Sequence, residues 1–198
     1  MEWTLEKEYM DKGYTAICGT DEAGRGPLAG PVFAAACILP YGIEIEGLND
    51  SKKLTEKKRK KIFDIICQKA VCYEIAYATT EEIDEINILN ASQLAMRRAV
   101  NGLSKKADIV LVDGNVARGF DIPAVTVIKG DAISPTIAAA SILAKVARDE
   151  VCYQMDKEYP EYGFAKHKGY GTKAHMDAVR KYGPCPLHRK TFLSFLNK

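Results

Sequence analysis

The sequence predicts an α/β layer fold with a mixed central sheet. Short apolar runs of strand character alternate along the chain with segments whose apolar residues have helical spacing, a pattern typical of α/β layer folds. The chain has 198 residues, of which 47% are hydrophobic and 27% are charged, as expected for a globular domain. We expect one main domain over residues 1–158. A short extension over residues 159–198 follows, in which glycine and proline leave room only for short helices at 173–182 and 190–196.

The first half of the chain predicts two strands, a helix and a third strand. Residues 14–19 and 31–39, YTAICG and PVFAAACIL, lie on either side of a glycine-rich turn. The second of these strands is too continuously apolar to be an exposed edge. Residues 55–70 have helical spacing, and residues 71–79, VCYEIAYAT, return to strand character.

The second half predicts two helices, two strands and a long helix. A short acidic helix with Thr80 as its N-cap precedes a helix over residues 90–103, since a threonine before an apolar periodic segment favours a helix start. Strands are predicted over residues 107–114 and 124–130. The longest helix is expected from residue 133 to residue 158, and small residues in its early part allow close packing on a sheet.

Charge is unevenly distributed, although the net charge is only +2. Residues 51–61 carry seven Lys and Arg against one Glu, and residues 162–190 carry seven against one Asp. Such segregation indicates basic surface patches that bind a polyanion such as nucleic acid. The run at 51–61 also fits the solvated face of a helix.

No segment of the chain has the pattern of a membrane span or a signal peptide. No run reaches the roughly 18 apolar residues that a membrane helix needs, and the first residues are acidic and polar rather than basic and then apolar. The six cysteines lack CxxC spacing and lie mostly in apolar runs, which favours reduced, buried thiols over disulfides or zinc sites. We therefore expect a cytoplasmic monomer without membrane contact.

Four carboxylates lie at or after the ends of predicted strands: Asp21, Glu22, Asp113 and Asp131. Neighbouring strands of an open α/β sheet end at one crevice, so we expect these side chains to share it. Carboxylates packed together repel one another and raise each other's pKa values unless a cation compensates them. Oxygen ligands without nearby His or Cys favour Mg²⁺ or Mn²⁺, and two such ions about 4 Å apart hydrolyse phosphodiesters. An isolated Asp at a strand end can equally be an N-cap or turn residue.

A Gly-Arg-Gly turn follows the first two carboxylates. Gly24 and Gly26 leave the backbone bare, so that its N–H groups can approach a phosphate. Arg25 adds a guanidinium group, which binds phosphate through two hydrogen bonds.

Six sequence blocks occur in order between residues 19 and 192: GTDEAGRGPLAGPV, LNDSKKLT, LVDGN, KGDAISPTIAAASILAKVARD, HKGYGTKAH and GPCPLHRKTF. Together they resemble the signature blocks of ribonuclease HII, the type 2 ribonuclease H family. The resemblance implies a ribonuclease H-like fold: a mixed five-stranded sheet flanked by helices, with a short helical C-terminal extension. It also implies cleavage of the RNA strand of RNA/DNA hybrids and incision 5′ of single ribonucleotides in duplex DNA, leaving 3′-hydroxyl and 5′-phosphate ends.

The resemblance further implies roles for individual residues. The family's metal-binding carboxylates fall on Asp21, Glu22, Asp113 and Asp131, and its Gly-Arg-Gly element, which holds the scissile ribonucleotide, falls on residues 24–26. Tyr170 matches the tyrosine that stacks on the following deoxyribose and so senses a missing 2′-hydroxyl, the group that distinguishes RNA from DNA. Lys52 and Lys53 match a segment that approaches the substrate backbone.

Further residues refine the assignment within the family. The arginine in DEAGRG favours type HII over type HIII, and we expect no additional N-terminal domain of the HIII kind. No clamp-binding motif is evident in TFLSFLNK. The histidines His167, His175 and His188 are expected to be structural or to contact substrate, because two-metal hydrolysis does not require a histidine.

Two alternatives to this assignment stay open. A junction-resolving DNA nuclease also uses clustered carboxylates and would cleave branched DNA that contains no ribonucleotide. A nucleic-acid-binding module with a merely structural acidic cluster would bind without turnover at any metal concentration.

Overall fold

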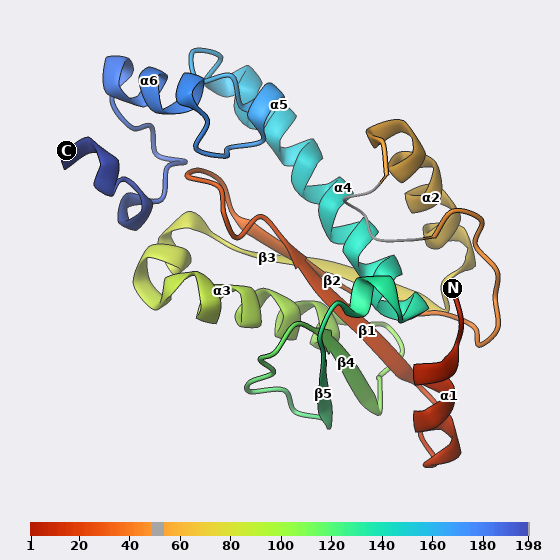
Figure 1. Ribbon diagram of the computed structural model, residues 1–198. Helices are drawn as coiled ribbons and strands as arrows, with labels where there is room; N and C mark the ends of the chain where they lie inside the picture. The colour runs from red at the N-terminus through yellow and green to blue at the C-terminus, as the bar shows by residue number, and fades with distance from the viewer. Residues whose placement is uncertain (49–53, 198) are drawn as a thin grey trace.

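The centre of the protein is a five-stranded mixed sheet with helices on both faces (Figure 1). The computed structural model describes residues 1–48 and 54–197. The strands are β1 (Ile17–Ala23), β2 (Val32–Ile38), β3 (Cys72–Ala78), β4 (Ile109–Asp113) and β5 (Ala124–Val127).

The sheet has the strand order β3-β2-β1-β4-β5. The pairs β1–β2 and β2–β3 are antiparallel, whereas β1–β4 and β4–β5 are parallel, which confirms the predicted mixed sheet. In the register of β1 and β4, Thr20 lies opposite Val112. Asp21 and Asp113 therefore follow at the next position of two adjacent parallel strands.

Helices cover the two faces of the sheet and also form part of the C-terminal segment. They are α1 (Thr4–Asp11), α2 (Glu56–Lys69), α3 (Thr80–Gly102), α4 (Pro135–Glu158), α5 (Phe164–His167) and α6 (Lys173–Tyr182). α3 packs on the face that includes Ala34 and Ala36 of β2, and α2 and α4 pack on the opposite face, against Ala35 and Cys37. Because side chains of a strand alternate between faces, β2 is buried on both sides, and this explains its continuous apolar sequence.

Two strands, β1 and β5, differ from their predicted ranges by three or more residues at one or both ends. β1 extends to Ala23, so Asp21 and Glu22 belong to the strand rather than follow it. β5 ends at Val127 because the chain leaves the sheet, and Lys129 adopts a left-handed conformation with φ 56°. The short 3-10 helix η2 (Gly130–Ala132) follows directly.

The N-cap of α3 is Thr79 rather than the predicted Thr80. The Thr79 hydroxyl accepts a hydrogen bond from the Glu82 N–H at 3.2 Å, and the Glu82 carboxylate accepts one from the Thr79 N–H at 2.9 Å. This reciprocal capping box satisfies two N–H groups at once. The two helices predicted in this region are confirmed as the two segments of α3, which are separated by a break at Asn87 (φ 64°). The Asn87 side chain caps the second segment by accepting from the Leu89 N–H at 3.1 Å.

The N-terminal helix α1 was not predicted, and α4 begins later than expected. α4 begins at Pro135 with Ser134 as its N-cap. The buried Glu6 of α1 accepts hydrogen bonds from the hydroxyl groups of Ser134 at 2.6 Å and Thr136 at 2.9 Å. The Glu6 carboxylate therefore holds α1 against the start of α4. The polar N-terminal sequence did not predict that this side chain is buried.

The C-terminal segment packs on the end of α4 and on the turn between β1 and β2. A small apolar cluster joins Ala29 and Met155 to Tyr162, Phe164 and Val179. The helix predicted at 173–182 is confirmed as α6, whereas the one predicted at 190–196 is two 3-10 helices, η3 (Lys190–Phe192) and η4 (Ser194–Asn197). The division of the chain after residue 158 remains a prediction.

Two expectations about the chain's chemistry can be compared with the structure. Of the six free cysteines, Cys18, Cys37, Cys72 and Cys152 are buried as predicted, whereas Cys67 and Cys185 are partly exposed. In the part of the chain that the structure describes, no helix is long and apolar enough to cross a membrane.

Candidate active site

The four predicted carboxylates lie at the end of the sheet where the parallel strands β1, β4 and β5 finish. Asp21 and Glu22 are near the end of β1, Asp113 is the last residue of β4, and Asp131 lies in η2 just beyond β5. Asp113 Oδ1 accepts hydrogen bonds from the N–H groups of Gly130 at 2.7 Å and Asp131 at 3.4 Å. These bonds fix the turn that carries Asp131 beside the end of β4.

Burial and mutual repulsion perturb the titration of Asp21 and Glu22. Burial raises the pKa of Asp21 well above its ordinary value, and the charges of Glu22 and Asp113 raise it further, against a hydrogen bond with Ser141. Burial also raises the pKa of Glu22, while Arg25 opposes the rise through a contact of 3.3 Å between Nη1 and Oε1. The three carboxylates are therefore close enough to repel one another, as predicted, and a cation bound between them would relieve that repulsion.

The carboxylates supply only oxygen donors, which fit Mg²⁺ or Mn²⁺. However, within residues 1–48 and 54–197 no group of three or more His, Cys, Asp or Glu side chains is arranged to hold a metal ion. The donor set thus fits a hard divalent cation in its chemistry and its place in the fold. Side chains have to rotate before three of them can share one ion.

Gly24 and Gly26 let the turn after β1 pack closely on its neighbours, and at Gly24 the contact permits only glycine. Gly24 has φ 98°, and a Cβ atom there would lie 2.3 Å from Nε of Arg148. A Cβ atom at Gly26 would lie 3.3 Å from Cε1 of Tyr170. The two glycines therefore let the turn pack beneath Arg148 and against the ring of Tyr170.

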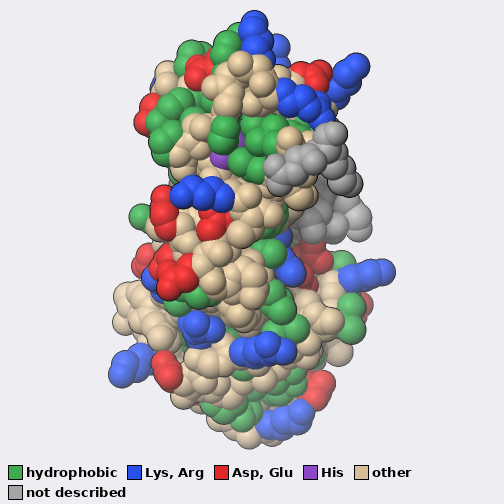
Figure 2. Space-filling view, turned by 90° about the vertical axis from the view of Figure 1, so that its left-hand side faces the viewer, with side chains coloured by type: hydrophobic (Ala, Val, Ile, Leu, Met, Phe, Trp, Pro, Cys, Tyr) green, Lys and Arg blue, Asp and Glu red, His purple; other side chains and the backbone are tan. Residues whose placement is uncertain are grey.

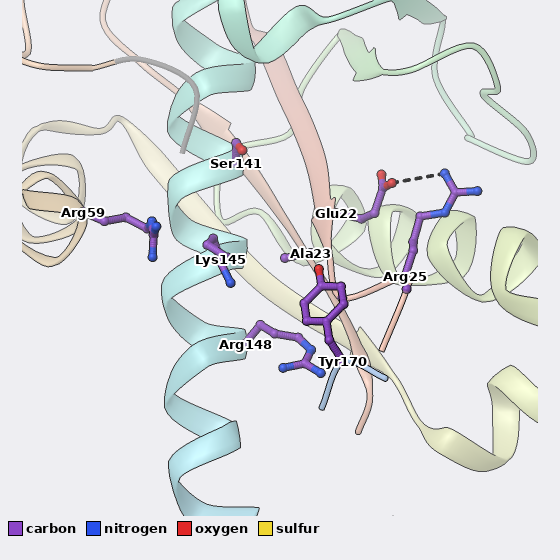
Figure 3. Close-up of a pocket in the computed structure, with 10 residues that line it drawn as sticks. Glu22, Ala23, Arg25, Arg59, Ser141, Lys145, Arg148 and Tyr170 are labelled. Carbon is purple, nitrogen blue, oxygen red and sulfur yellow. Dashed lines mark hydrogen bonds and ion pairs between the residues drawn. The ribbon is translucent and has the colours of Figure 1, made fainter. Parts of the chain in front are cut away.

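A pocket of about 440 Å³ opens beside this turn (Figure 3). It is lined by Glu22, Ala23, Gly24, Arg25, Gly26, Arg59, Ser141, Lys145, Arg148 and Tyr170. The structure thus brings together Glu22, the turn at 24–26 and Tyr170, which lie far apart in the sequence. Asp21, Asp113 and Asp131 are not among the described residues that line the pocket, and Lys52 and Lys53 lie outside the described residues.

One face of α4 contributes residues that the sequence analysis missed. Ser141, Lys145 and Arg148 follow one another along the side of the helix that looks into the pocket (Figure 3). Their spacing of four and three residues places them on one helix face, and this spacing was a signal that could have identified them. Arg148 Nη2 donates to the Ala29 carbonyl at 3.1 Å, whereas its buried Nε has no hydrogen-bond partner in the described part of the chain.

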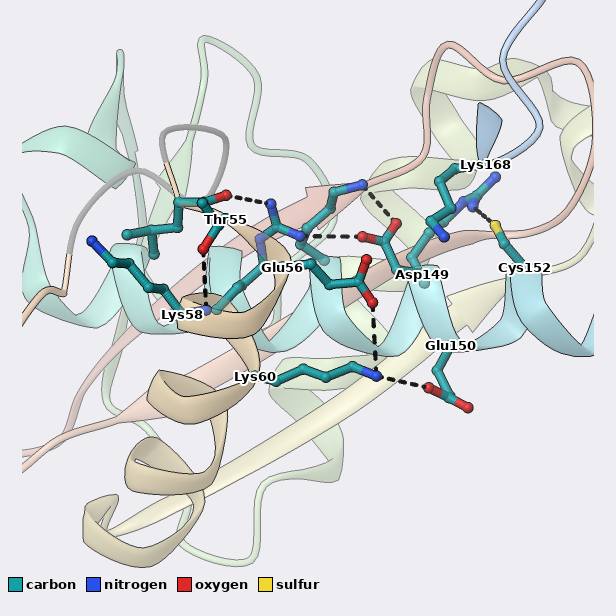
Figure 4. A network of polar contacts seen from close by, with 12 residues as sticks. Thr55, Glu56, Lys58, Lys60, Asp149, Glu150, Cys152 and Lys168 are labelled. Atoms are coloured by element: carbon teal, nitrogen blue, oxygen red, sulfur yellow. Dashed lines mark hydrogen bonds and ion pairs between the residues drawn. The ribbon is translucent and has the colours of Figure 1, made fainter. Parts of the chain in front are cut away.

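A buried ion-pair network connects α2 to the same face of α4 (Figure 4). Asp149 accepts from Lys145 Nζ at 2.6 Å and from Arg59 Nη1 at 3.3 Å. Arg59 also donates to the Leu54 carbonyl at 2.9 Å. At least one residue of the basic run at 51–61 is therefore buried and paired at the pocket, not merely part of a solvated helix face.

Arg189 holds the Gly-Arg-Gly turn from behind. It is fully buried and donates to the carbonyl groups of Gly30 at 2.8 Å, Arg25 at 2.9 Å and Gly24 at 2.6 Å. Burial, together with the nearby charge of Arg148, lowers the pKa of Arg189 to about 9. No local pattern in the sequence indicated this contact, because its partners lie about 160 residues earlier.

The sequence model of ribonuclease HII matches residues 18–197. The chain belongs to the ribonuclease HII family. A ribonuclease HII of Clostridioides difficile is 55% identical over 189 residues, which cover 96% of this chain and 74% of that protein. One of Acetivibrio thermocellus is 56% identical over 187 residues, which cover 94% of this chain and 73% of that protein.

A solved structure agrees with the family assignment. The crystal structure of the ribonuclease H2 from Pyrococcus horikoshii OT3 superimposes with a TM-score of 0.74 at 27% identity, covering 92% of this chain and 98% of that one. The fold is thus ribonuclease H-like, as predicted. A ribonuclease HII is a metal-dependent endoribonuclease that cleaves the RNA strand of RNA/DNA hybrids. The comparisons support neither a junction resolvase nor a non-enzymatic binding module.

Proposed function

We propose that this ribonuclease HII incises duplex DNA on the 5′ side of a single embedded ribonucleotide and leaves 3′-hydroxyl and 5′-phosphate ends. The observation that carries the proposal is the contact between Tyr170 and Gly26 in the pocket beside the carboxylates. An aromatic ring packed on the turn that grips one nucleotide can test the sugar of the next nucleotide. Because Tyr170 is 47% exposed, a free face of its ring is available for stacking.

The substrate backbone is held by cationic and bare backbone groups of the pocket. Arg25, 49% exposed at its side chain, can reach a phosphate from outside. The buried Nε of Arg148 lies against Gly24 of the turn and has no hydrogen-bond partner among the described residues, and a phosphate oxygen that approached through the pocket would satisfy it. Charge-assisted hydrogen bonds of this kind position the duplex without reading its sequence.

The hydrolysis is assigned to the strand-end carboxylates. Asp21, Glu22, Asp113 and Asp131 would hold two divalent cations, which supply an activated water and stabilise the leaving oxygen of the scissile phosphodiester. The hydrogen bonds from Gly130 and Asp131 to Asp113 Oδ1 fix one oxygen of that carboxylate. Its other oxygen would then be the one offered to a cation.

The test is gel-resolved cleavage of a duplex with one embedded ribonucleotide, beside an all-DNA duplex and a long RNA/DNA hybrid. With Mg²⁺ or Mn²⁺ we expect a single incision 5′ of the ribonucleotide, no cleavage of all-DNA, and loss of cleavage with chelator or in Asp21→Asn. Tyr170→Ala should lose activity chiefly on the single-ribonucleotide duplex. Retained hybrid cleavage without incision at a single ribonucleotide would refute the proposal.

A further inference from the structure

All three histidines of the chain lie together behind Tyr170. His175 and His188 are 0% and 3% exposed, and the rings of His167 and His175 stack with centroids 4.4 Å apart and an interplanar angle of 14°. Tyr162 and Phe164 pack against these rings. On the face shown in Figure 2, histidine is visible only as a small patch among hydrophobic side chains.

The contacts of His175 determine its tautomer. Its Nδ1 lies 2.9 Å from the carbonyl oxygen of Tyr170, and because a carbonyl can only accept, Nδ1 carries the proton. In a neutral imidazole the other nitrogen is then an acceptor. His175 Nε2, which lies 3.1 Å from Nε2 of His188, must therefore accept a hydrogen bond from the His188 Nε2–H.

The contacts of His188 agree with this assignment. If His188 Nε2 donates to His175, its Nδ1 must accept, and Nδ1 does accept from the Cys185 N–H at 3.0 Å. His167 is fixed in the same way. Its Nε2 lies 2.8 Å from the Tyr162 carbonyl, and its Nδ1 accepts from the Gly169 N–H at 3.2 Å. One set of neutral tautomers thus satisfies all three rings.

The histidine pair connects the two elements that the proposed function assigns to the substrate. On one side His175 holds the Tyr170 carbonyl, and the Tyr170 N–H donates to the His167 carbonyl at 2.9 Å. On the other side His188 directly precedes Arg189, whose side chain holds the carbonyl groups of Gly24 and Arg25. The His175–His188 hydrogen bond therefore joins the support of Tyr170 to the support of the Gly-Arg-Gly turn.

We propose that His175 and His188 are positioning residues that set the place of Tyr170 relative to the Gly-Arg-Gly turn, and so set the selectivity for single ribonucleotides. This inference rests on the proposed sensing role of Tyr170. The connection requires neutral rings. A second proton on His175 would place two donors against each other across the 3.1 Å contact with His188, and a second proton on His188 would place an Nδ1–H against the Cys185 N–H. Burial favours that neutral state, because it lowers the pKa of both His175 and His188.

The same geometry argues against a metal site at these histidines. His175 Nε2 and His188 Nε2 point at each other, and the remaining nitrogens are used by backbone groups. Among the residues that the structure describes, no His, Cys, Asp or Glu group of three or more is arranged to hold a metal ion. The three rings serve to connect segments of the chain.

The first test is nitrogen-15 NMR of the histidine rings, which is simplified because the chain has only three histidines. At pH 7 we expect neutral rings, with the proton of His175 on Nδ1 and the protons of His167 and His188 on Nε2. A proton on Nε2 of His175, or a doubly protonated His175 or His188, would overturn the proposal.

The second test separates the two hydrogen bonds of His175. Asn places its amide donor near the position of Nδ1, so His175→Asn can keep the Tyr170 carbonyl contact, whereas His175→Gln can keep an acceptor for His188. His175→Phe keeps the ring but loses both bonds. We expect the ratio of kcat/KM on a single-ribonucleotide duplex to kcat/KM on a long hybrid to fall by about tenfold in His175→Phe. Smaller losses are expected in His175→Asn and His175→Gln.

The matched control is Asp177→Asn, on the exposed face of the same helix, which should leave the ratio unchanged. Thermal unfolding of each variant identifies any that fails to fold. An unchanged ratio in a folded His175→Phe, when Tyr170→Ala lowers it, would refute the positioning role. An unchanged ratio in Tyr170→Ala would instead refute the sensing role, and the NMR tautomers would still decide whether the hydrogen-bonded connection exists.

Discussion

Replacing Arg189 by Met should destabilise the protein and displace the Gly-Arg-Gly turn. The guanidinium makes three hydrogen bonds to backbone carbonyls, at 2.8, 2.9 and 2.6 Å, and bonds from a charged donor contribute about 1.5 kcal/mol each. Burial disfavours the charged form, as the lowered pKa of about 9 shows, and removing the charge recovers part of the loss. We therefore expect a net decrease of about 3 kcal/mol in the free energy of unfolding.

The assay combines thermal unfolding with cleavage kinetics. For a protein of this size, about 2–4 °C of Tm corresponds to 1 kcal/mol, so the expected decrease is about 6–12 °C. A displacement of the turn by about 1 Å would lower kcat/KM by about a hundredfold. Arg189→Lys keeps the charge but cannot reach three carbonyls at once, and should lie between the wild type and Arg189→Met. Lys190→Met, at the exposed neighbouring position, is the control for Tm. A fully active Arg189→Met with a Tm within about 2 °C of wild type would refute this role for the buried guanidinium.

Three further predictions follow from the site. Gly24→Ala places a Cβ atom 2.3 Å from Arg148 Nε at a φ of 98°, so it should lower both Tm and cleavage. The control Gly42→Ala, at a φ of 78° with no atom within 4 Å, should lower only Tm. Equal cleavage by the two variants would contradict this prediction. Burial lowers the pKa of His175 to about 4, and the charges of His167 and His188 contribute. Between about pH 6.5 and pH 4, His175 is therefore protonated more in the unfolded chain than in the folded protein. Tm should fall as the pH falls through that window, less steeply in His175→Asn, and parallel pH profiles would refute the assignment. Chelator should abolish cleavage, and added Mn²⁺ should restore cleavage and raise Tm. In Asp113→Asn, Mn²⁺ should raise Tm by less than in the wild type. An equal rise of Tm would show that Asp113 is not a metal ligand.

The sequence alone determined the mixed sheet, most of its strands and the carboxylate edge. This was possible because strand and helix periodicities are local properties, and because the ends of parallel strands meet at one edge whatever else the chain does. The sequence alone therefore predicted that Asp21, Asp113 and Asp131 lie at the same end of the sheet. The ordered signature blocks identified the family, and with it the expected substrate roles of Tyr170 and of the Gly-Arg-Gly turn.

Only the tertiary structure decided how that edge is supported. The hydrogen bonds of Arg189 span about 160 residues, the burial of Glu6 depends on the start of α4, and the tautomers of the histidines depend on which carbonyl each ring meets. None of these contacts leaves a periodic signal in the sequence. Each exists because two distant segments are packed together, and buried polar groups must then find partners where the fold provides them.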